Sequence, residues 1–516
     1  MLVGAVARRR GWVLADSGMR FVVIGGGPAG LRAASSAARL GAEVVLVERD
    51  VVGGAANLWD CIPSKAMIAT GALVGRARRA ELLGLAPLAP GVDLAALADR
   101  VRGLEERLAA QMTRQLESQG VTIVRGTGRL VGPHSVRVTL CDAAAEVEAD
   151  RTSASLSAST ARPTPGSSGE PGPGSGHPAR PGPGSGEPGP LTETLDADAV
   201  LLSTGSFPRI PGFAEVDGER VLTTRQAYPP PVVPEHLVVI GSGVTGVEFV
   251  HMFASLGSAV TLIVSRQQVL PAKDPEVAAA LEADFLSRGV ALCMGARAVA
   301  IDRRTDCVSV KCNDGRAIDG SHALICIGSI PASEGLGLEA AGVSTKDGYV
   351  PVNQHCQTNV QHIYAAGDLS GRLPLASVAS VQGHKVAEHV MGLHTRKHRH
   401  LDYDKAASAI FTEPEIADVG LAEAEAFALG RKIRVTKVPY AANARSLIDG
   451  DSRGFVKLVS DPATGVVLGG SIVGAHAAEL ISVVALAVTA NLRVIDLAES
   501  LFVHPALAEA LAEAAE

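Results

Sequence analysis

The chain has 516 residues, of which 47% are hydrophobic and 20% charged, enough for two or three domains with cores of their own. A formal net charge of -7 and an aromatic content of 3% argue against a nucleic-acid partner, which needs a basic surface or stacking platforms. Seven cysteines are an odd, sparse set, so we expect a cytoplasmic protein rather than a secreted disulfide scaffold. The longest apolar run, around residues 480–488, is shorter than the roughly 18 residues of a membrane helix. We therefore expect no membrane span, and no metal site is predicted.

Two segments lie outside the expected folded domains. Residues 1–18 place three arginines before an apolar stretch too short for a signal peptide, and we interpret them as an extension, with Met19 the better start. Residues 151–190 are rich in Pro, Gly and Ser, a composition that buries too little apolar surface to offset the entropy lost on ordering. The flanking stretches 134–140 and 195–205 are typical of strands, so we predict a disordered insert in a surface hairpin.

The first folded segment is predicted to be a strand, a glycine-rich turn, a helix and a second strand. An apolar run ends at Ile24, GGGPAG follows, an Ala-rich helix runs to Leu40, and EVVLV leads to Glu48. Gly25, Gly27 and Gly30 occupy the positions that let backbone N–H groups and a helix N-terminus approach a pyrophosphate. Glu48 is expected to accept hydrogen bonds from an adenosine ribose.

A second copy of this pattern begins at residue 237. Gly241, Gly243 and Gly246 again lie between an apolar strand and a helix, which Gly257 ends. Two such units predict two dinucleotides in separate domains, one a resident cofactor and one a diffusible partner.

The two copies differ where the ribose is held. Seven residues after Gly257 stands Val264 instead of a carboxylate, and Ser265 and Arg266 follow. A hydroxyl and a guanidinium favour tolerance of a 2′-phosphate, so NADPH is expected to bind at least as well as NADH. The alternative is that Arg266 is a solvated loop charge.

Several further motifs occur in a fixed order: STG (203–205), ICIGSIP (325–331), IYAAGDLSGRLPLAS (363–377), FTEPEIADVGL (411–421) and VHPALAE (503–509). With the glycine-rich turns, they make the chain resemble the flavoprotein disulfide reductases, most closely the dihydrolipoamide dehydrogenase type. The resemblance implies an α/β fold with two Rossmann-like dinucleotide-binding domains and a C-terminal α+β dimerisation domain.

By similarity, residues 19–228 and 330–399 form the FAD-binding domain, 229–329 the NAD(P)-binding domain, and 400–516 the interface domain of a homodimer. The residues expected to bind FAD are Gly25, Gly27, Gly30, Glu48, Lys65, Gly128, Thr204, Gly205, Ser206, Asp368, Leu375, Ala376 and Ser377. Those expected to bind NADPH or NADH are Gly241, Gly243, Gly246, Glu248, Ser265, Arg266 and Gly328.

The stretch GGAANLWDCIPSK (53–65) departs from this family. In this stretch the family pattern has two cysteines, which form a redox disulfide. Cys61 matches the second of these cysteines, whereas Ala56 occupies the position of the first. Thr, Asn and Gly of the pattern are also replaced, by Ala55, Leu58 and Asp60. Thiol–disulfide exchange needs a second thiol to resolve the mixed disulfide, so ordinary dihydrolipoamide chemistry is not expected.

No other cysteine pair is predicted to substitute. Cys307 and Cys312 have the same spacing, but DCVSVKCND is typical of a strand, on which these residues would be about 16 Å apart and point to opposite faces. Cys61 itself is either inert against the flavin or an oxidisable sensor. Because Asp60 disfavours its thiolate, we favour the inert interpretation.

The hydride half of the reaction is predicted to survive. Lys65 and Glu248 match the family's buried ion pair beside flavin and nicotinamide, where their charges stabilise a reduced flavin. Small Ala55 and Ala56 leave room for a planar acceptor, and a flavin passes two electrons to a quinone without a protein thiol. The sequence is similar to the branch of the family that lacks the first cysteine and has NAD(P)H:quinone oxidoreductase activity.

Three alternatives stay open. His504 and Glu509 match the family's catalytic dyad, and they either protonate the quinone or persist as an interface pair without a catalytic role. A residual dihydrolipoyl dehydrogenase activity is the second. The third is a non-enzymatic flavin- and NADP-binding subunit whose cofactor occupancy controls a partner.

Overall fold

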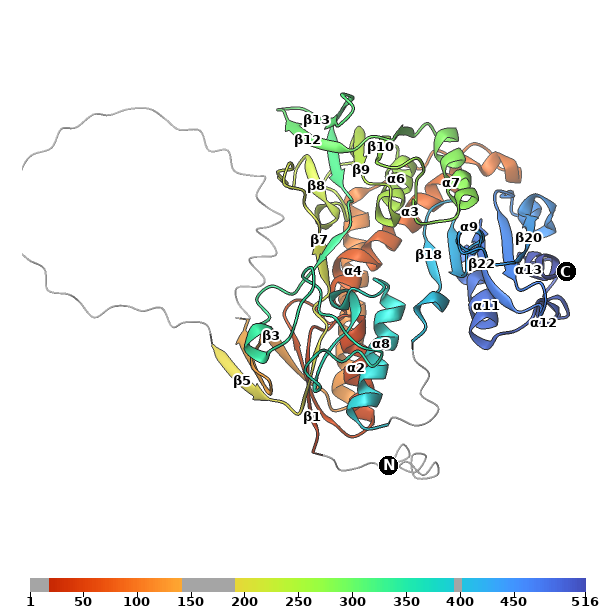
Figure 1. The fold of residues 1–516 in the computed structure, drawn as a ribbon. Helices are drawn as coiled ribbons and strands as arrows, with labels where there is room; N and C mark the ends of the chain where they lie inside the picture. Colours follow the sequence, from red (N-terminus) through yellow and green to blue (C-terminus); the bar gives the residue numbers. More distant parts are fainter. Residues whose placement is uncertain (1–17, 142–190, 394–400) are drawn as a thin grey trace, which may run out of the picture.

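The computed structural model describes residues 18–141, 191–393 and 401–516. The predicted insert lies outside these ranges, as does the predicted extension apart from Gly18. Figure 1 shows three sheets in sequence-separated regions, the first below, the second above it and the third, from the C-terminal part, to one side.

The first sheet has seven strands in the order β17-β6-β1-β2-β3-β4-β5. Its strands are β1 (Arg20–Ile24), β2 (Glu43–Glu48), β3 (Thr122–Gly132), β4 (Ser135–Leu140), β5 (Thr192–Asp196), β6 (Ala199–Leu202) and β17 (Ile363–Ala365). The five strands from β17 to β3 are parallel, and β3, β4 and β5 are antiparallel. A hairpin does flank the insert, formed by β4 and β5. The second predicted strand, 195–205, lies too late in the chain, because it covers only the end of β5 and includes β6, which pairs with β1 and β17 instead.

Four helices belong to this region: α2 (Pro28–Arg39), α3 (Ile62–Arg78), α4 (Leu94–Ser118) and α8 (Ala376–Val390). The helices α2 and α8 lie side by side in Figure 1, and a Cβ at Gly383 would be 2.0 Å from the carbonyl oxygen of Ala29. Only glycine permits this approach, which closes one face of the sheet.

The second sheet has five parallel strands in the order β11-β10-β9-β15-β8. They are β8 (Val221–Thr223), β9 (His236–Ile240), β10 (Ala259–Val264), β11 (Ala291–Met294) and β15 (His322–Ile325), accompanied by α6 (Val244–Leu256) and α7 (Pro275–Ser287). A three-stranded sheet, β12 (Ala298–Arg303), β13 (Val308–Cys312) and β14 (Ala317–Gly320), lies beside it, and β7 (Ser206–Pro208) pairs with β16 (Ser329–Pro331). Both larger sheets therefore carry the parallel order that the glycine-rich turns predict.

The C-terminal region is an antiparallel sheet with helices. Its strands, in the order β18-β19-β22-β21-β20, are β18 (Ser408–Ile410), β19 (Ile416–Gly420), β20 (Arg434–Pro439), β21 (Phe455–Ser460) and β22 (Val467–Val473). Its helices are α9 (Glu423–Ala428), α10 (Ala444–Ile448), α11 (Ala477–Ala490), α12 (Val494–Ala498) and α13 (Glu509–Ala515). The apolar run near 480–488 lies in α11, whose buried face packs in this core, and no described helix is both long and apolar enough to cross a membrane.

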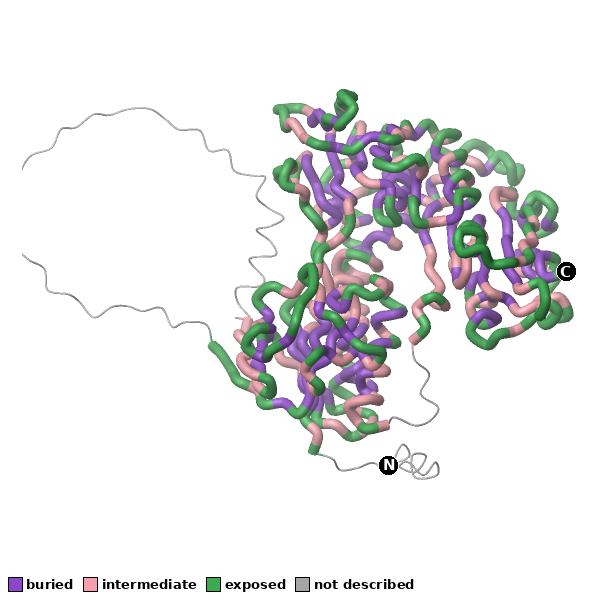
Figure 2. Tube along the Cα trace, viewed as in Figure 1, coloured by how far each residue is buried: buried purple, intermediate pink, exposed green. Residues whose placement is uncertain are grey.

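The interior of each sheet is buried, as Figure 2 shows by its purple strands. One core cluster extends across the regions, because Met67 of α3, Phe253 of α6 and Ile416 of β19 belong to it. The helix α3 packs against α6, where a Cβ at Gly71 would be 3.1 Å from the Cβ of Ser255. The regions thus share a continuous apolar core.

We expect Phe249→Ala to lower the free energy of unfolding by about 3–5 kcal/mol, because Phe249 is 1% exposed and its ring stacks 4.8 Å from that of Tyr228. Denaturant unfolding followed by fluorescence measures this loss. Phe427→Ala is the matched control: its ring is 86% exposed, and a change below about 0.5 kcal/mol is expected. Equal losses in both variants would contradict this account of the shared core.

Candidate active site

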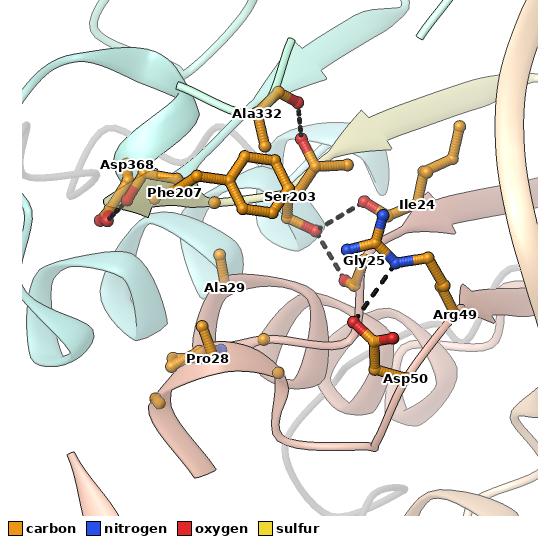
Figure 3. Close-up of a pocket in the computed structure, with 18 of the residues that line it drawn as sticks. Ile24, Gly25, Pro28, Ala29, Arg49, Asp50, Ser203, Phe207, Ala332 and Asp368 are labelled. Carbon is orange, nitrogen blue, oxygen red and sulfur yellow. Dashed lines mark hydrogen bonds and ion pairs between the residues drawn. The ribbon is translucent and has the colours of Figure 1, made fainter. Parts of the chain in front are cut away.

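The first glycine-rich turn joins β1 to α2 by a close backbone approach. Gly25 has a φ of +102°, and a Cβ there would be 2.5 Å from the carbonyl oxygen of Ser203. A Cβ at Gly30 would be 1.9 Å from the carbonyl oxygen of Gly25. The Ser203 hydroxyl donates to that same oxygen at 2.8 Å (Figure 3). These contacts bring the N-terminus of α2, with its free N–H groups, to the wall of a cavity.

This cavity, of about 430 Å³, is elongated. It extends from Glu48, Arg49 and Asp50 past the glycine turn to Cys61 and Asp368. The residues predicted for FAD that line it are Gly25, Gly27, Glu48, Gly128, Thr204, Gly205, Ser206, Asp368 and Ala376.

Four further residues predicted for FAD lie off this wall. Lys65 is one of them and pairs with Glu248. Gly30 supports the turn from behind, Leu375 precedes the first residue of α8, and Ser377 faces a second cavity. Nothing lies within 4 Å of a Cβ built at Gly27, so the turn leaves open space beside the helix N-terminus. An elongated cavity with a helix N-terminus near its middle fits a flavin dinucleotide, whose pyrophosphate is anionic.

Glu48 ends β2 at one end of the cavity and is buried. Burial raises the pKa of its carboxyl group, and the N–H groups of Asp50 and Gly26 oppose the shift by donating to it at 2.7 and 2.5 Å. Two backbone N–H groups thus already hold the carboxylate, and a ribose hydroxyl would use its remaining lone pairs. Arg49 forms an ion pair with Asp50 at the same end (Figure 3).

Polar groups from two strands line the middle of the cavity. Ser206 donates to Asp368 at 2.6 Å, and Thr204 donates to the carbonyl oxygen of Ala332 at 2.8 Å. Asp368 lies in the short 3₁₀-helix η5 (Gly367–Ser370), just after β17. Gly128 of β3 packs between Ile24 and Val47, where a Cβ would meet side chains at 3.2 Å. The parallel topology therefore brings these sequence-distant residues to one edge of the sheet.

The second glycine-rich turn repeats this geometry between β9 and α6. Gly241 has a φ of +110°, and a Cβ at Gly246 would be 1.8 Å from the carbonyl oxygen of Gly241. Gly243 precedes the first residue of α6. Ser265 and Arg266 follow β10 directly and are exposed, and Gly328 follows β15. All these residues lie at the carboxyl edge of the parallel sheet, where a dinucleotide binds in such folds.

Cys61 follows a single turn of π-helix, η1 (Ala56–Asp60). The N–H of Cys61 donates to the carbonyl oxygen of Ala56 at 3.1 Å, which places the two residues next to each other in space. All seven cysteines lie in the described ranges, and none of them is in a disulfide. The position beside Cys61 thus holds a methyl group where a second thiol would be needed for a disulfide.

The thiol of Cys61 is held in its protonated form. Burial raises its pKa, Asp60, Glu248 and Asp368 raise it further, and Lys65 opposes the shift. The sequence predicted the effect of Asp60, whereas burial is the larger cause.

Lys65 and Glu248 come together as predicted. The Lys65 ammonium donates to one carboxylate oxygen of Glu248 at 2.9 Å, and the N–H of Phe411 donates to the other at 2.9 Å. The ammonium also lies 4.8 Å from the centre of the Phe411 ring. Glu248 is nearly buried and Lys65 is one-third exposed, so the pair is strongly held but reachable.

A second cavity, of about 440 Å³, shares four lining residues with the first: Pro28, Ala56, Cys61 and Ala376. Its other walls are largely apolar and come from α2, α4 and α8, with Leu31, Met112 and Leu116 among them. Ala56 and Cys61 thus form part of a thin partition between the two cavities.

His504 and Glu509 form the predicted pair in the C-terminal region. The Nδ1 atom of His504 lies 2.7 Å from a Glu509 oxygen, and the N–H of Ala506 donates to the other oxygen at 2.8 Å. That N–H and His504 lower the pKa of Glu509. The His504 side chain is 74% exposed, and neither residue lines the two cavities described above.

Sequence reasoning missed Arg225 at this site. It lies in the 3₁₀-helix η3 (Thr224–Gln226), lines the first cavity and forms an ion pair with Asp60 at 3.2 Å. No motif marks this residue, because only the fold brings it to Asp60. Sequence reasoning also missed that Cys312 and Cys293 are neighbours. Burial of Cys312, followed by the effect of Cys293, raises the pKa of the Cys312 thiol to about 11.

Models of two protein families match the chain. The pyridine nucleotide-disulphide oxidoreductase model matches residues 19–383, and the model of the dimerisation domain of these enzymes matches residues 406–515. The chain belongs to the pyridine nucleotide-disulphide oxidoreductase family. Members of this family use FAD and NAD(P)H, and the two glycine-rich turns described above are consistent with both cofactors.

Relatives of this oxidoreductase differ in their stated activities. An NAD(P)H dehydrogenase (quinone) of Mycobacterium tuberculosis is 38% identical over 508 residues, covering 96% of this chain and 93% of the relative. A dihydrolipoyl dehydrogenase of Bacillus subtilis is 31% identical over 499 residues, covering 96% of each chain. The crystal structure of LpdA from Mycobacterium tuberculosis superposes with a TM-score of 0.83 at 37% identity and covers 96% of this chain and 99% of its own.

We expect Gly30→Ala to abolish retention of FAD, because the added methyl group would overlap the Gly25 carbonyl and push α2 away from β1. The ratio of flavin to protein absorbance after gel filtration measures retention. Gly103→Ala in α4 is the control, since nothing lies within 4 Å of a Cβ there and full retention is expected. Full retention by both variants would contradict the proposed role of the close approach.

We expect the Cys61 thiol to alkylate slowly at neutral pH, with a rate that rises about tenfold per pH unit and reaches no plateau below pH 9. The reason is that a raised pKa leaves little thiolate at lower pH. Iodoacetamide labelling from pH 6 to 10, with the Cys61 peptide quantified by mass spectrometry, measures this profile. A plateau at or below pH 8 would show a stabilised thiolate and contradict the expectation.

Proposed function

We propose that this protein is a homodimeric NAD(P)H:quinone oxidoreductase. Bound FAD would accept a hydride from NADPH or NADH and pass two electrons to a quinone. The observation that carries the proposal is Ala56 beside Cys61, because it removes the second thiol that disulfide chemistry requires while the cofactor-binding turns stay intact.

The chain's own residues would divide the work. Lys65, held by Glu248, would place a positive charge where reduction brings negative charge to the cofactor. Ser265 and Arg266 would accept the 2′-phosphate of NADPH at the end of β10. His504 and Glu509 would either donate a proton to the quinone from the partner subunit or serve only the interface between subunits.

The second cavity supports the choice of acceptor. Its walls are largely apolar, although Arg32 and Gln115 also line it, and its volume suits a small aromatic ring system. Ala56 and Cys61 lie between it and the first cavity. A planar quinone in this space would need no covalent contact with the protein. The name of the M. tuberculosis relative agrees with this assignment, whereas the name of the B. subtilis relative makes lipoamide the competing substrate.

Anaerobic stopped-flow measurements decide between these acceptors. We expect NADPH to reduce the flavin of the purified protein rapidly, with turnover on menadione and none on lipoamide. Turnover on lipoamide would show that another thiol replaces Ala56 and would overturn the proposal. Tight NADP(H) retention with negligible turnover on either acceptor would favour a non-enzymatic subunit.

The variant Ala56→Cys is the matched control for this experiment. The new thiol would lie next to Cys61, and we expect oxidation to remove two titratable thiols by forming a disulfide. Ala55→Cys adds a thiol one position away and is expected to leave the thiol count of the oxidised protein higher by one.

A further inference from the structure

The second cavity has one charged side chain on its wall. Among the described residues that line it, Arg32 is the only one that is charged at neutral pH, and none is a carboxylate. Arg32 is exposed, and within the described part of the chain its guanidinium takes part in no ion pair and no hydrogen bond. A guanidinium stays protonated and binds carboxylates and other oxyanions well. Arg32 is therefore available to an anion that enters the cavity.

Two helices place Arg32 one turn away from the partition between the cavities. Pro28 at the start of α2 (Figure 3) and Ala376 at the start of α8 line both cavities. Arg32 and Ser380 follow them by four residues each and line only the second cavity. Four residues of an α-helix advance by about 6 Å, and side chains four positions apart share a helix face. The second cavity thus extends along α2 and α8, from the partition toward Arg32.

The end of the cavity at the partition has the opposite polarity. Asn57 follows Ala56 in η1, lines the cavity and is 2% exposed, and its Nδ2 atom donates to the carbonyl oxygen of Glu105 at 3.1 Å. Its Oδ1 atom is buried and has no hydrogen-bond partner among the described residues. An amide oxygen only accepts hydrogen bonds and repels an anion, whereas a guanidinium only donates. An acidic group on a ligand would therefore lie at Arg32 and not at Asn57.

Apolar side chains connect these two ends. They come from α2, α3 and α4, and they are Leu31, Ile62, Met112 and Leu116. Such walls bury an aromatic ring, while a few polar groups fix its orientation. Because Arg32 is exposed, an anion that pairs with it keeps contact with water and loses little hydration. The cavity is thus built for a ring at one end and an acid at the other.

We propose that Arg32 makes the second cavity selective for fused-ring quinones that carry an acidic substituent, a sulfonate or a carboxylate. This inference rests on the proposed function and names the class of acceptor. The ring would lie against the partition, beside the first cavity, and the acidic group would pair with Arg32. A neutral quinone would be held by the apolar walls alone.

Binding of two naphthalenes tests the charge selectivity without turnover. The probes 2-naphthalenesulfonate and 2-naphthalenemethanol share a ring system and differ in charge. Calorimetry measures the Kd of each for the oxidised holoprotein, with NADP⁺ at saturation to occupy the nucleotide site. We expect Arg32→Gln to weaken binding of the sulfonate about fivefold, the loss of one exposed ion pair, and to change binding of the alcohol less than about twofold.

Three further variants complete the binding test. Arg39→Gln is the matched control, because Arg39 is the last residue of α2, is exposed and does not line the cavity, and unchanged binding of both probes is expected. Arg32→Lys keeps a cation and should retain most of the affinity for the sulfonate. Ser35→Trp adds a large side chain to the cavity wall and should weaken binding of both probes.

Steady-state turnover tests the same selectivity on quinones. The kcat/KM of Arg32→Gln for 1,4-naphthoquinone-2-sulfonate should be about fivefold below that of the wild-type protein, with the change in KM and not in kcat. Its kcat/KM for menadione should stay within about twofold of wild type. Comparing each quinone between the two proteins removes the difference in their intrinsic reactivity.

Each other outcome has a defined meaning. Sulfonate binding by Arg32→Gln equal to wild type, or an equal loss in Arg39→Gln, overturns the inference. Unchanged binding of both probes to Ser35→Trp also overturns it, because the probes then bind elsewhere. Absence of turnover with both quinones in the wild-type protein overturns the proposed function, while the two naphthalenes still show whether Arg32 selects for charge. Menadione turnover without any Arg32-dependent difference overturns this inference alone.

Discussion

One buried carboxylate joins the three regions of the molecule. Glu248 belongs to α6. One of its carboxylate oxygens accepts from Lys65 of α3, and the other accepts from the N–H of Phe411, which directly follows β18 of the C-terminal sheet. The Glu248 carboxylate is nearly buried. Without both partners, the free-energy cost of removing its charge from water would not be offset. The regions therefore have to meet in one arrangement. It holds Lys65 one helical turn after Cys61, which lines the first cavity.

The apolar packing strengthens this arrangement. A single core cluster contains side chains from α3, α6 and β19, so movement of one region against the others would expose apolar surface. The result is a rigid frame around the short π-helical turn η1, which holds Ala56 beside Cys61. A change of a few residues in η1 leaves the frame intact, because the frame depends on contacts elsewhere.

Local patterns predicted the parts of the site that depend on local backbone geometry. The glycine turns and the two parallel sheets followed from short motifs, because tight turns and helix N-termini admit few residue types. The Lys65–Glu248 pair, whose residues are 183 positions apart, followed only from the resemblance to a known family. The ion pair of Asp60 with Arg225 could not be predicted in this way. These residues are 165 positions apart, on elements attached to different sheets. The local sequence around one of them gives no indication of the other. The second cavity likewise arises from three helices that meet only in the folded chain.

The hairpin of β4 and β5 has a practical consequence. The two strands pair from Ser135 and Asp196 onward, and the N–H of Leu140 donates to the carbonyl oxygen of Leu191 at 2.9 Å, so the chain leaves and re-enters the sheet at one point. β5 is the edge strand, and none of its residues lines either cavity (Figure 1). Thr192 and Glu193 of this edge strand are exposed. They are natural attachment points for a fluorophore or an affinity tag, because both cavities lie elsewhere.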